Sequence, residues 1–414
     1  MHAIERLIYN RIRFHPRLKK SVTTIYQSLF SLVPGPKIDS SFPVQIREGY
    51  FFGFHDKCPW SLDNSKLLAH KFDNACSFPE EGDKIIIGYF NGDSSAEYVP
   101  LAQTPTWNWQ MGSMLQWVGE TGKILYNDYD GERHVARIIT CNGELVATLP
   151  RPVAALSIDG THAISHSFIR LRKVARAYSY PIGAEEKADL PITDKDGLYL
   201  INLVTGTVKE LFSLVKIAAI HPEDSMRKAY HYFTHPLFAP NGERFVFFHR
   251  WVTPAGQTWT RMFSSDISGE KLHLFKTAGV VTHTAWKDNQ RILAYALIKG
   301  IGDHYYLFTD LTDRFEIIGK DYFTSDGHPQ FAPDKKRFVT DTYPDRHRRQ
   351  RLIIYDTENK IPQLLLNARS PLRYRGDVRC DFHPRWDRKG NQVAFDSAHT
   401  GTRALCTVSL PDLK

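Results

Sequence analysis

The chain has 414 residues, of which 42% are hydrophobic, 13% aromatic and 24% charged. This composition excludes a disordered or collagen-like protein, and no apolar run approaches the roughly 20 residues that cross a membrane. The 53 basic and 45 acidic residues leave a net charge of +8, which favours a negatively charged partner.

Residues 1–36 predict a basic amphipathic helical extension. Apolar residues recur at helical spacing on both sides of Pro16, and the Pro-Gly-Pro sequence at residues 34–36 ends the pattern. The basic residues outnumber the single acid, Glu5; they are Arg6, Arg11, Arg13, Arg17, Lys19 and Lys20. Two interpretations stay open. The helix at residues 1–33 lies on an anionic membrane surface, or it packs across the main domain with its basic side in water.

The cysteines and the amino terminus both bear on the cellular compartment. The five cysteines are far apart and form no CxxC pair, so neither a disulfide framework nor a zinc knuckle is indicated. Residues 1–33 lack the continuous apolar core and the cleavage site of a signal peptide. We therefore expect a cytoplasmic protein, located at the inner face of the membrane if the extension binds lipid.

A repeat within residues 42–412 predicts an all-β fold, a seven-bladed β-propeller. Each clear copy has a histidine, an aromatic residue three positions later, a polar turn and an apolar strand; these copies begin at His235, His283, His328 and His383. Less exact copies bring the aromatic or apolar anchors to seven, at residues 60, 117, 156, 238, 286, 331 and 386. Seven four-stranded units are what such a propeller requires, and the long interval between residues 156 and 238 must also hold an insertion.

The last unit lacks one strand. Only the segments near residues 391–396 and 403–409 follow the last anchor. We expect Val44–Ile46 to pair with residues 404–409, because ring closure by both ends of the chain removes an exposed sheet edge.

The repeat also places the histidines. Equivalent positions of successive blades recur around the propeller axis, so the four repeat histidines should ring one mouth of the channel. Neutral imidazole is a common ligand of transition metals and a common general base, which predicts a metal or catalytic site. The alternative is that each histidine only hydrogen-bonds the turn of its blade. We expect further polar side chains at the same mouth, namely His249, Arg250, Gln330 and Tyr343.

A second group of residues stands in the third unit. In a strand, His166 and Arg170 would share one face, and Tyr178 follows closely. A base, a guanidinium group and a phenol at this spacing could bind and deprotonate an anionic sugar. The alternative is a basic surface strand whose tyrosines pack against its neighbour.

The repeat motif, the segment Ser325–Gln330 and the residues from Asp381 to Ser397 resemble the seven-bladed propeller polysaccharide lyases, which include oligogalacturonate and ulvan lyases. The chain is similar also to uncharacterised propellers of bacterial surface-polysaccharide gene clusters. The resemblance implies a divalent metal, manganese or zinc, on His283, His328, Gln330 and His383. The candidate catalytic residues are His166, Arg170, Tyr178, His235, His249, Arg250 and Tyr343.

The resemblance implies cleavage of an acidic, uronic-acid-containing oligosaccharide or polysaccharide by β-elimination. The basic loops at residues 346–351 and 369–375 suit such a partner. The positive charge is otherwise dispersed and no nucleic-acid-binding module is evident, so nucleic acid is not an expected partner. Two other classes stay open: a non-catalytic propeller that binds a glycan or scaffolds polysaccharide assembly, and another carbohydrate enzyme such as a transferase.

Overall fold

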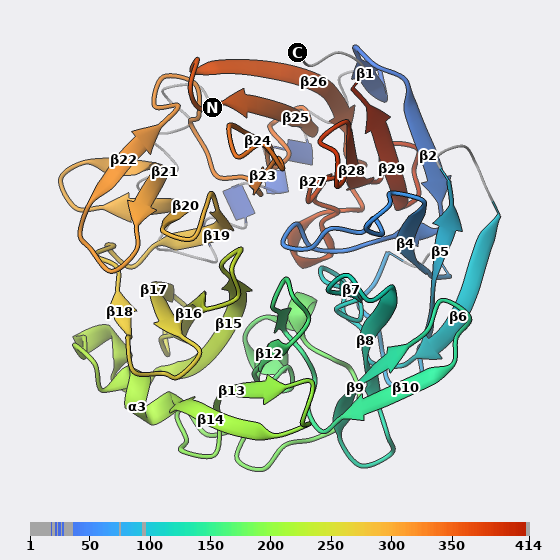
Figure 1. Ribbon diagram of the computed structural model, residues 1–414. Helices are drawn as coiled ribbons and strands as arrows, with labels where there is room; N and C mark the ends of the chain where they lie inside the picture. Colours follow the sequence, from blue (N-terminus) through green and yellow to red (C-terminus); the bar gives the residue numbers. More distant parts are fainter. Residues whose placement is uncertain are drawn as a thin grey trace.

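The computed structural model describes residues 18, 21–22, 24–25, 27–28, 36–73, 76–92 and 97–410. The strands of these residues form seven sheets, which Figure 1 shows arranged as blades around a central axis. The predicted seven-bladed β-propeller is therefore confirmed. Within the described ranges, no helix has the length and the apolar character needed to span a membrane.

The first three blades are each built from four consecutive antiparallel strands. The first blade contains β3 (Tyr50–Phe51), β4 (Lys66–Lys71), β5 (Ile85–Asn91) and β6 (Tyr98–Thr104). The second contains β7 (Gln116–Val118), β8 (Lys123–Tyr129), β9 (His134–Ile139) and β10 (Leu145–Leu149). The third contains β11 (Ala155–Leu156), β12 (His162–Ser165), β13 (Gly197–Asn202) and β14 (Val208–Ser213).

The next three blades follow the same plan, and the sixth gains a fifth strand from the amino-terminal side. The fourth contains β15 (Tyr230–Phe238), β16 (Arg244–Val252), β17 (Thr258–Asp266) and β18 (His273–Leu274). The fifth contains β19 (Val281–Trp286), β20 (Arg291–Ile298), β21 (Gly302–Thr309) and β22 (Phe315–Ile318). The sixth contains β23 (Gln330–Phe331), β24 (Arg337–Asp341), β25 (Arg349–Asp356) and β26 (Ile361–Arg369), with β1 (Ile38–Ser40) outside them.

The seventh blade closes the ring with strands from both ends of the chain. It contains β27 (Arg385–Trp386), β28 (Gln392–Ser397), β29 (Ala404–Ser409) and β2 (Val44–Glu48). Val44 lies opposite Val408 and Ile46 lies opposite Cys406, so the predicted closing pair is confirmed. The inward side chains of this pair pack into the apolar core between the sixth and seventh blades.

Helical structure in the described chain after residue 36 is restricted to short turns. They are η1 (Arg170–Lys173), η2 (Arg176–Tyr178), α3 (Leu214–Ala218), η3 (Asp224–Met226) and η4 (Gly376–Val378). The first four lie in the long interval between the third and fourth anchors, which holds the predicted insertion. The boundary between the extension at residues 1–36 and the propeller at 42–412 stays a prediction, since most of the extension lies outside the described residues.

Several polar turns of the repeat are held by aspartate side chains. Asp63, Asp159 and Asp334 each accept a hydrogen bond from the backbone N–H two residues later. This arrangement stabilises a tight turn through contacts within the turn itself. The positions of these turns could therefore be predicted from the local sequence.

The repeat position three residues before the anchor has a left-handed backbone conformation in several blades. The angle φ is 54° at His235, 40° at His283 and 45° at His383. Positive φ is uncommon for residues other than glycine. Met114 occupies the same position in the second blade with φ of 58°. The left-handed conformation therefore does not require a histidine, so the conformation alone does not explain the imidazole groups.

Candidate functional site

Five buried histidines lie around the ring of Phe54. The ring centre of Phe54 lies 4.9 Å from that of His235 and 4.8 Å from that of His383. The ring of His328 lies 4.1 Å from His283 and 4.3 Å from His383. The structure thus brings the four repeat histidines together. It adds a fifth, His55, whose ring lies 5.4 Å from that of His328.

A buried ionic network sets the position of Phe54 and His55. Asp396 is completely buried and accepts hydrogen bonds from the backbone N–H groups of Phe52 and Gly53, at 3.2 and 3.3 Å. Arg385 and Arg403 pair with the same carboxylate, at 3.1 and 2.7 Å. Gly53 has φ of 119°, and a Cβ there would lie 2.8 Å from neighbouring backbone. Only glycine fits this loop, which inserts the Phe54 side chain among the histidines.

Asp341, at the end of β24, orients two of the histidine-bearing segments. Its carboxylate lies 2.8 Å from Nδ1 of His328 and accepts the backbone N–H groups of Phe382 and His383. Burial lowers the pKa of His328, but the Asp341 carboxylate outweighs this effect and the pKa is raised. Because His328 uses Nδ1 for this contact, its Nε2 is not occupied by Asp341.

Three ligand-type side chains lie within reach of one ion. Ligand atoms of His328, Asp381 and His383 are all within 4.8 Å of one another, and the three residues are buried. Nε2 of His328 and both ring nitrogens of His383 have no hydrogen-bond partner in the described structure. Burial, followed by the neighbouring His328, lowers the pKa of His383 well below 6.5, so its imidazole is neutral. Two imidazole nitrogens and one carboxylate are a ligand set that suits a divalent transition metal.

The carboxylate of Asp381 is shared with an arginine. Nε of Arg379 donates to it at 2.6 Å, and the guanidinium carbon lies 4.6 Å from the ring centre of Tyr343. The ring of Tyr343 in turn lies 5.5 Å from that of His328. Burial lowers the pKa of Arg379, but Asp381 outweighs it and the pKa is raised, so the cation is permanent. Tyr343 therefore lies beside the histidine cluster, as expected.

His235 and Tyr178 lie next to each other, and both rings contact Phe54. The rings of His235 and Tyr178 are 5.5 Å apart. Burial, followed by the charge of Arg250, lowers the pKa of His235 well below 6.5, and its Nε2 has no described partner. Burial raises the pKa of Tyr178 to about 12. At neutral pH this arrangement offers an unprotonated imidazole, a protonated phenol and a guanidinium group together.

The structure gives Gln330 a different role from the predicted metal ligand. Its Nε2 donates to the carbonyl oxygen of His55 at 2.8 Å, and its Oε1 accepts from the backbone N–H of Trp386 at 2.6 Å. The amide therefore ties the first and seventh blades to the sixth. His283, the other predicted ligand, uses Nδ1 to contact Asp326 at 3.0 Å.

The predicted strand through His166 and Arg170 is wrong. The strand β12 ends at Ser165, and Oγ of Ser167 accepts the backbone N–H of Arg170, which begins the turn η1. A serine side chain that bonds backbone in this way competes with sheet hydrogen bonding. His166 is instead buried against the ring of Phe168, and burial lowers its pKa to about 4.

Arg170 is not available to bind a substrate carboxylate, so that prediction is also wrong. Its guanidinium group is buried and pairs with Asp196 at 3.4 Å. The group also donates to four backbone carbonyl oxygens, those of Ala188, Leu190, Pro191 and His231. Arg170 thus fixes the insertion of the third blade.

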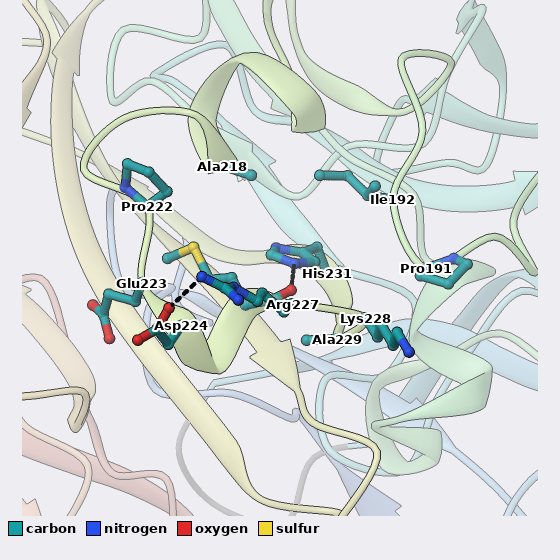
Figure 2. Close-up of a pocket in the computed structure, with 11 residues that line it drawn as sticks. Pro191, Ile192, Ala218, Pro222, Glu223, Asp224, Arg227, Lys228, Ala229 and His231 are labelled. Carbon is teal, nitrogen blue, oxygen red and sulfur yellow. Dashed lines mark hydrogen bonds and ion pairs between the residues drawn. The ribbon is translucent and has the colours of Figure 1, made fainter.

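His249 does not lie with the central histidines, which contradicts its predicted place at the channel mouth. Phe248 faces His235 at 5.6 Å, and successive residues of a strand point to opposite sides. Nε2 of His249 therefore meets Nδ1 of His231 at 2.9 Å, and its Nδ1 contacts Arg261. His231 lines a separate, mostly apolar hollow of about 360 Å³, shown in Figure 2.

Three contributors to the site carried little signal in the sequence. His55 and Arg379 lie in loops outside the repeat frame, and Asp381 stands two residues before the repeat histidine His383. A histidine or acid two residues from a repeat histidine is the signal that could have identified Asp381. His55 and Arg379 lie near the other histidines only because the blades close into a ring, which the local sequence does not show.

The propeller is similar to solved structures of two lyases. An oligogalacturonate lyase in complex with manganese matches 91% of this chain and 96% of its own, with a TM-score of 0.63 and 14% identity. An oligogalacturonate lyase from Vibrio parahaemolyticus matches 92% of this chain and 99% of its own, with a TM-score of 0.59 and 13% identity. At these identities the likeness concerns the fold. No family model matches the sequence, and no curated protein matches it.

Proposed function

We propose that the chain is a metal-dependent lyase that cleaves an acidic, uronic-acid-containing glycan by β-elimination. The observation that carries this proposal is the cluster of His328, Asp381 and His383, with buried ring nitrogens that lack described partners. Such nitrogens are costly unless a ligand uses them. The fold similarity to a lyase solved with manganese supports the same reading.

The metal centre would be held by His328, Asp381 and His383, with His283 beside it. When bound, a divalent ion neutralises the uronate carboxylate and so acidifies the proton on C5. Arg250, near His235 and Tyr178, supplies a second positive charge for the same carboxylate.

The acid and base roles follow from the protonation states. Nε2 of His235 accepts the C5 proton, since its low pKa keeps it unprotonated. The electron pair of that C–H bond forms the C4=C5 double bond as the C4–O4 bond breaks. The phenol of Tyr178 donates its proton to the leaving O4, and the tyrosinate recovers a proton from the imidazolium or from water.

The second candidate is a propeller that binds an acidic glycan without cleaving it, as part of surface-polysaccharide assembly. The ion pair between Arg379 and Asp381 favours this candidate, because it already neutralises the carboxylate that a metal would use. The cluster would then contain arginines and histidines for carboxylate binding only.

An elimination assay distinguishes the two candidates. Purified protein would be incubated with a panel of uronic-acid oligomers and polymers, and C4=C5 unsaturated product followed by its ultraviolet absorbance. The lyase proposal predicts product with at least one substrate, abolished by chelator and restored by manganese. Glycan binding with no product from any member of the panel would support the second candidate.

A further inference from the structure

The described helical residues near the amino terminus contact the sixth blade through a polar side chain. Nε2 of Gln27 donates to the carbonyl oxygen of Pro344 at 3.1 Å, and its Oε1 accepts from Arg348 at 2.9 Å. Arg348 is buried and also donates to Ser370 and Tyr374, so the contact rests on a fixed group. One edge of the helix is therefore anchored to the loop between β24 and β25.

The same helix exposes a row of apolar side chains. Leu18, Val22 and Ile25 are 51%, 38% and 63% exposed, whereas Gln27 is half-buried. Spacings of four and three residues place the three apolar side chains on one face of a helix. Among the described residues of this segment, the apolar side chains are exposed and Gln27 contacts the propeller, whereas an ordinary surface helix buries its apolar residues.

We propose that this apolar row binds the surface of an anionic lipid bilayer. The charge of the segment selects this occupant: residues 1–20 carry six basic residues and one acid. An apolar helix face flanked by lysine and arginine is typical of helices that lie in the plane of a lipid interface. A protein partner with an apolar groove would account for the exposed row but not for the excess of positive charge.

The contact fixes where the lipid would lie relative to the histidine cluster. Pro344, which Gln27 contacts, directly follows Tyr343, whose ring is 5.5 Å from that of His328. A bilayer bound by the helix would lie on the side of the propeller that carries this loop. The inference does not depend on the proposed lyase activity, because a non-catalytic propeller would be recruited in the same way.

Vesicle co-sedimentation of the full chain tests this proposal. The probes are vesicles of phosphatidylcholine alone and vesicles of phosphatidylcholine with phosphatidylserine, at low and high salt. We expect binding to the anionic vesicles only, weakened by salt. The double variant Leu18→Glu/Ile25→Glu should lose binding, and Lys19→Ala should weaken it about fivefold, the effect of one surface charge.

Matched control variants test whether the loss of binding is specific to the apolar row. Val204→Glu and Leu311→Glu change apolar residues that are 81% and 49% exposed elsewhere on the propeller, and should bind vesicles like the native chain. The glutamate variants should keep the native melting temperature, since the side chains that they replace are exposed. Failure of the native chain to bind anionic vesicles would overturn the proposal. So would a native dimer that the double variant converts to a monomer, because a second copy would then cover the row.

Discussion

The carboxylate of Asp341 accepts two hydrogen bonds from His328, one from ring Nδ1 and one from the backbone N–H, both at 2.8 Å. The same carboxylate accepts the backbone N–H groups of Phe382 and His383 from the next blade. One buried acid therefore holds the imidazole of the sixth blade and the backbone of the seventh in register. The distance between the two histidine rings, 4.3 Å, depends on it.

Asp341→Asn should disrupt both blades at once. The amide cannot accept all four hydrogen bonds, and the substitution leaves His328 without its buried counter-charge. We expect a loss of about 3–5 kcal/mol in the free energy of unfolding, measured by denaturant titration. The control Asp334→Asn removes a partly exposed ion pair with Arg337 and should cost at most about 1 kcal/mol. Equal effects of the two substitutions would contradict the assigned role of Asp341.

Asp396→Asn should displace Phe54 and His55. The carboxylate is the counter-charge of two buried arginines and the acceptor for the loop that carries Phe54. Leaving the arginines unpaired should cost about 3–5 kcal/mol in the free energy of unfolding. The imidazole signals of His55 and His383 in NMR spectra should also shift. Unchanged signals would show that Phe54 is placed by packing alone.

Tyr178→Phe should separate chemistry from binding. It removes the proposed acid while the ring still packs against His235, so kcat should fall by about 10²–10⁴-fold with metal affinity unchanged. Tyr322→Phe is the control, since Tyr322 is partly buried against the core of the fifth and sixth blades, and this change should leave kcat unaffected. Native kcat in the Tyr178→Phe variant would eliminate Tyr178 as the acid.

The protein should lose stability as the pH falls below 6.5. Burial lowers the pKa of His70 to about 3 and the pKa values of His134 and His166 to about 4. Below pH 6.5 the unfolded chain therefore binds protons that the folded chain cannot, which favours unfolding. Each group costs up to about 1.4 kcal/mol per pH unit between pH 6.5 and its folded pKa.

Denaturant titrations at pH 7 and pH 5 measure this effect. The variant His166→Asn removes one of the titrating groups, so its stability should depend less steeply on pH. The raised pKa of His328 has the opposite sign, because its contribution is present in acid and is lost as the pH rises through the folded pKa. A free energy of unfolding that does not fall between pH 7 and pH 5 would contradict the lowered pKa values.

The fold was predictable because its signals are local. Several blades repeat a turn held by a polar side chain within the turn, such as Asp159, followed by an apolar strand. The number of strands after the last anchor was enough to predict that the last blade lacks one strand. Val44–Glu48 supplies this strand. The strand predicted through Arg170 was wrong because alternating apolar and polar residues also occur in turns. The deciding contact, from Oγ of Ser167, is not visible in a hydrophobicity pattern.

The candidate site was predictable only where it follows the repeat. His235, His283, His328 and His383 share one position, so the ring geometry brings them together. His55 reaches the same place from a loop, and no periodic pattern marks it. The predicted place of His249 was wrong because the repeat predicts where a strand ends but not which side of the sheet each residue faces. A shift of one residue moves a side chain to the opposite side of the sheet.

The central claim is most directly tested by titrating manganese into chelator-treated protein and into its His383→Ala variant, with calorimetric detection. His383 has both ring nitrogens free of described partners, so its removal should not break any hydrogen bond that holds the blade. The account predicts one ion per native chain and none in the folded variant. No binding by the native chain, or the same affinity in the variant, would contradict the proposed metal centre.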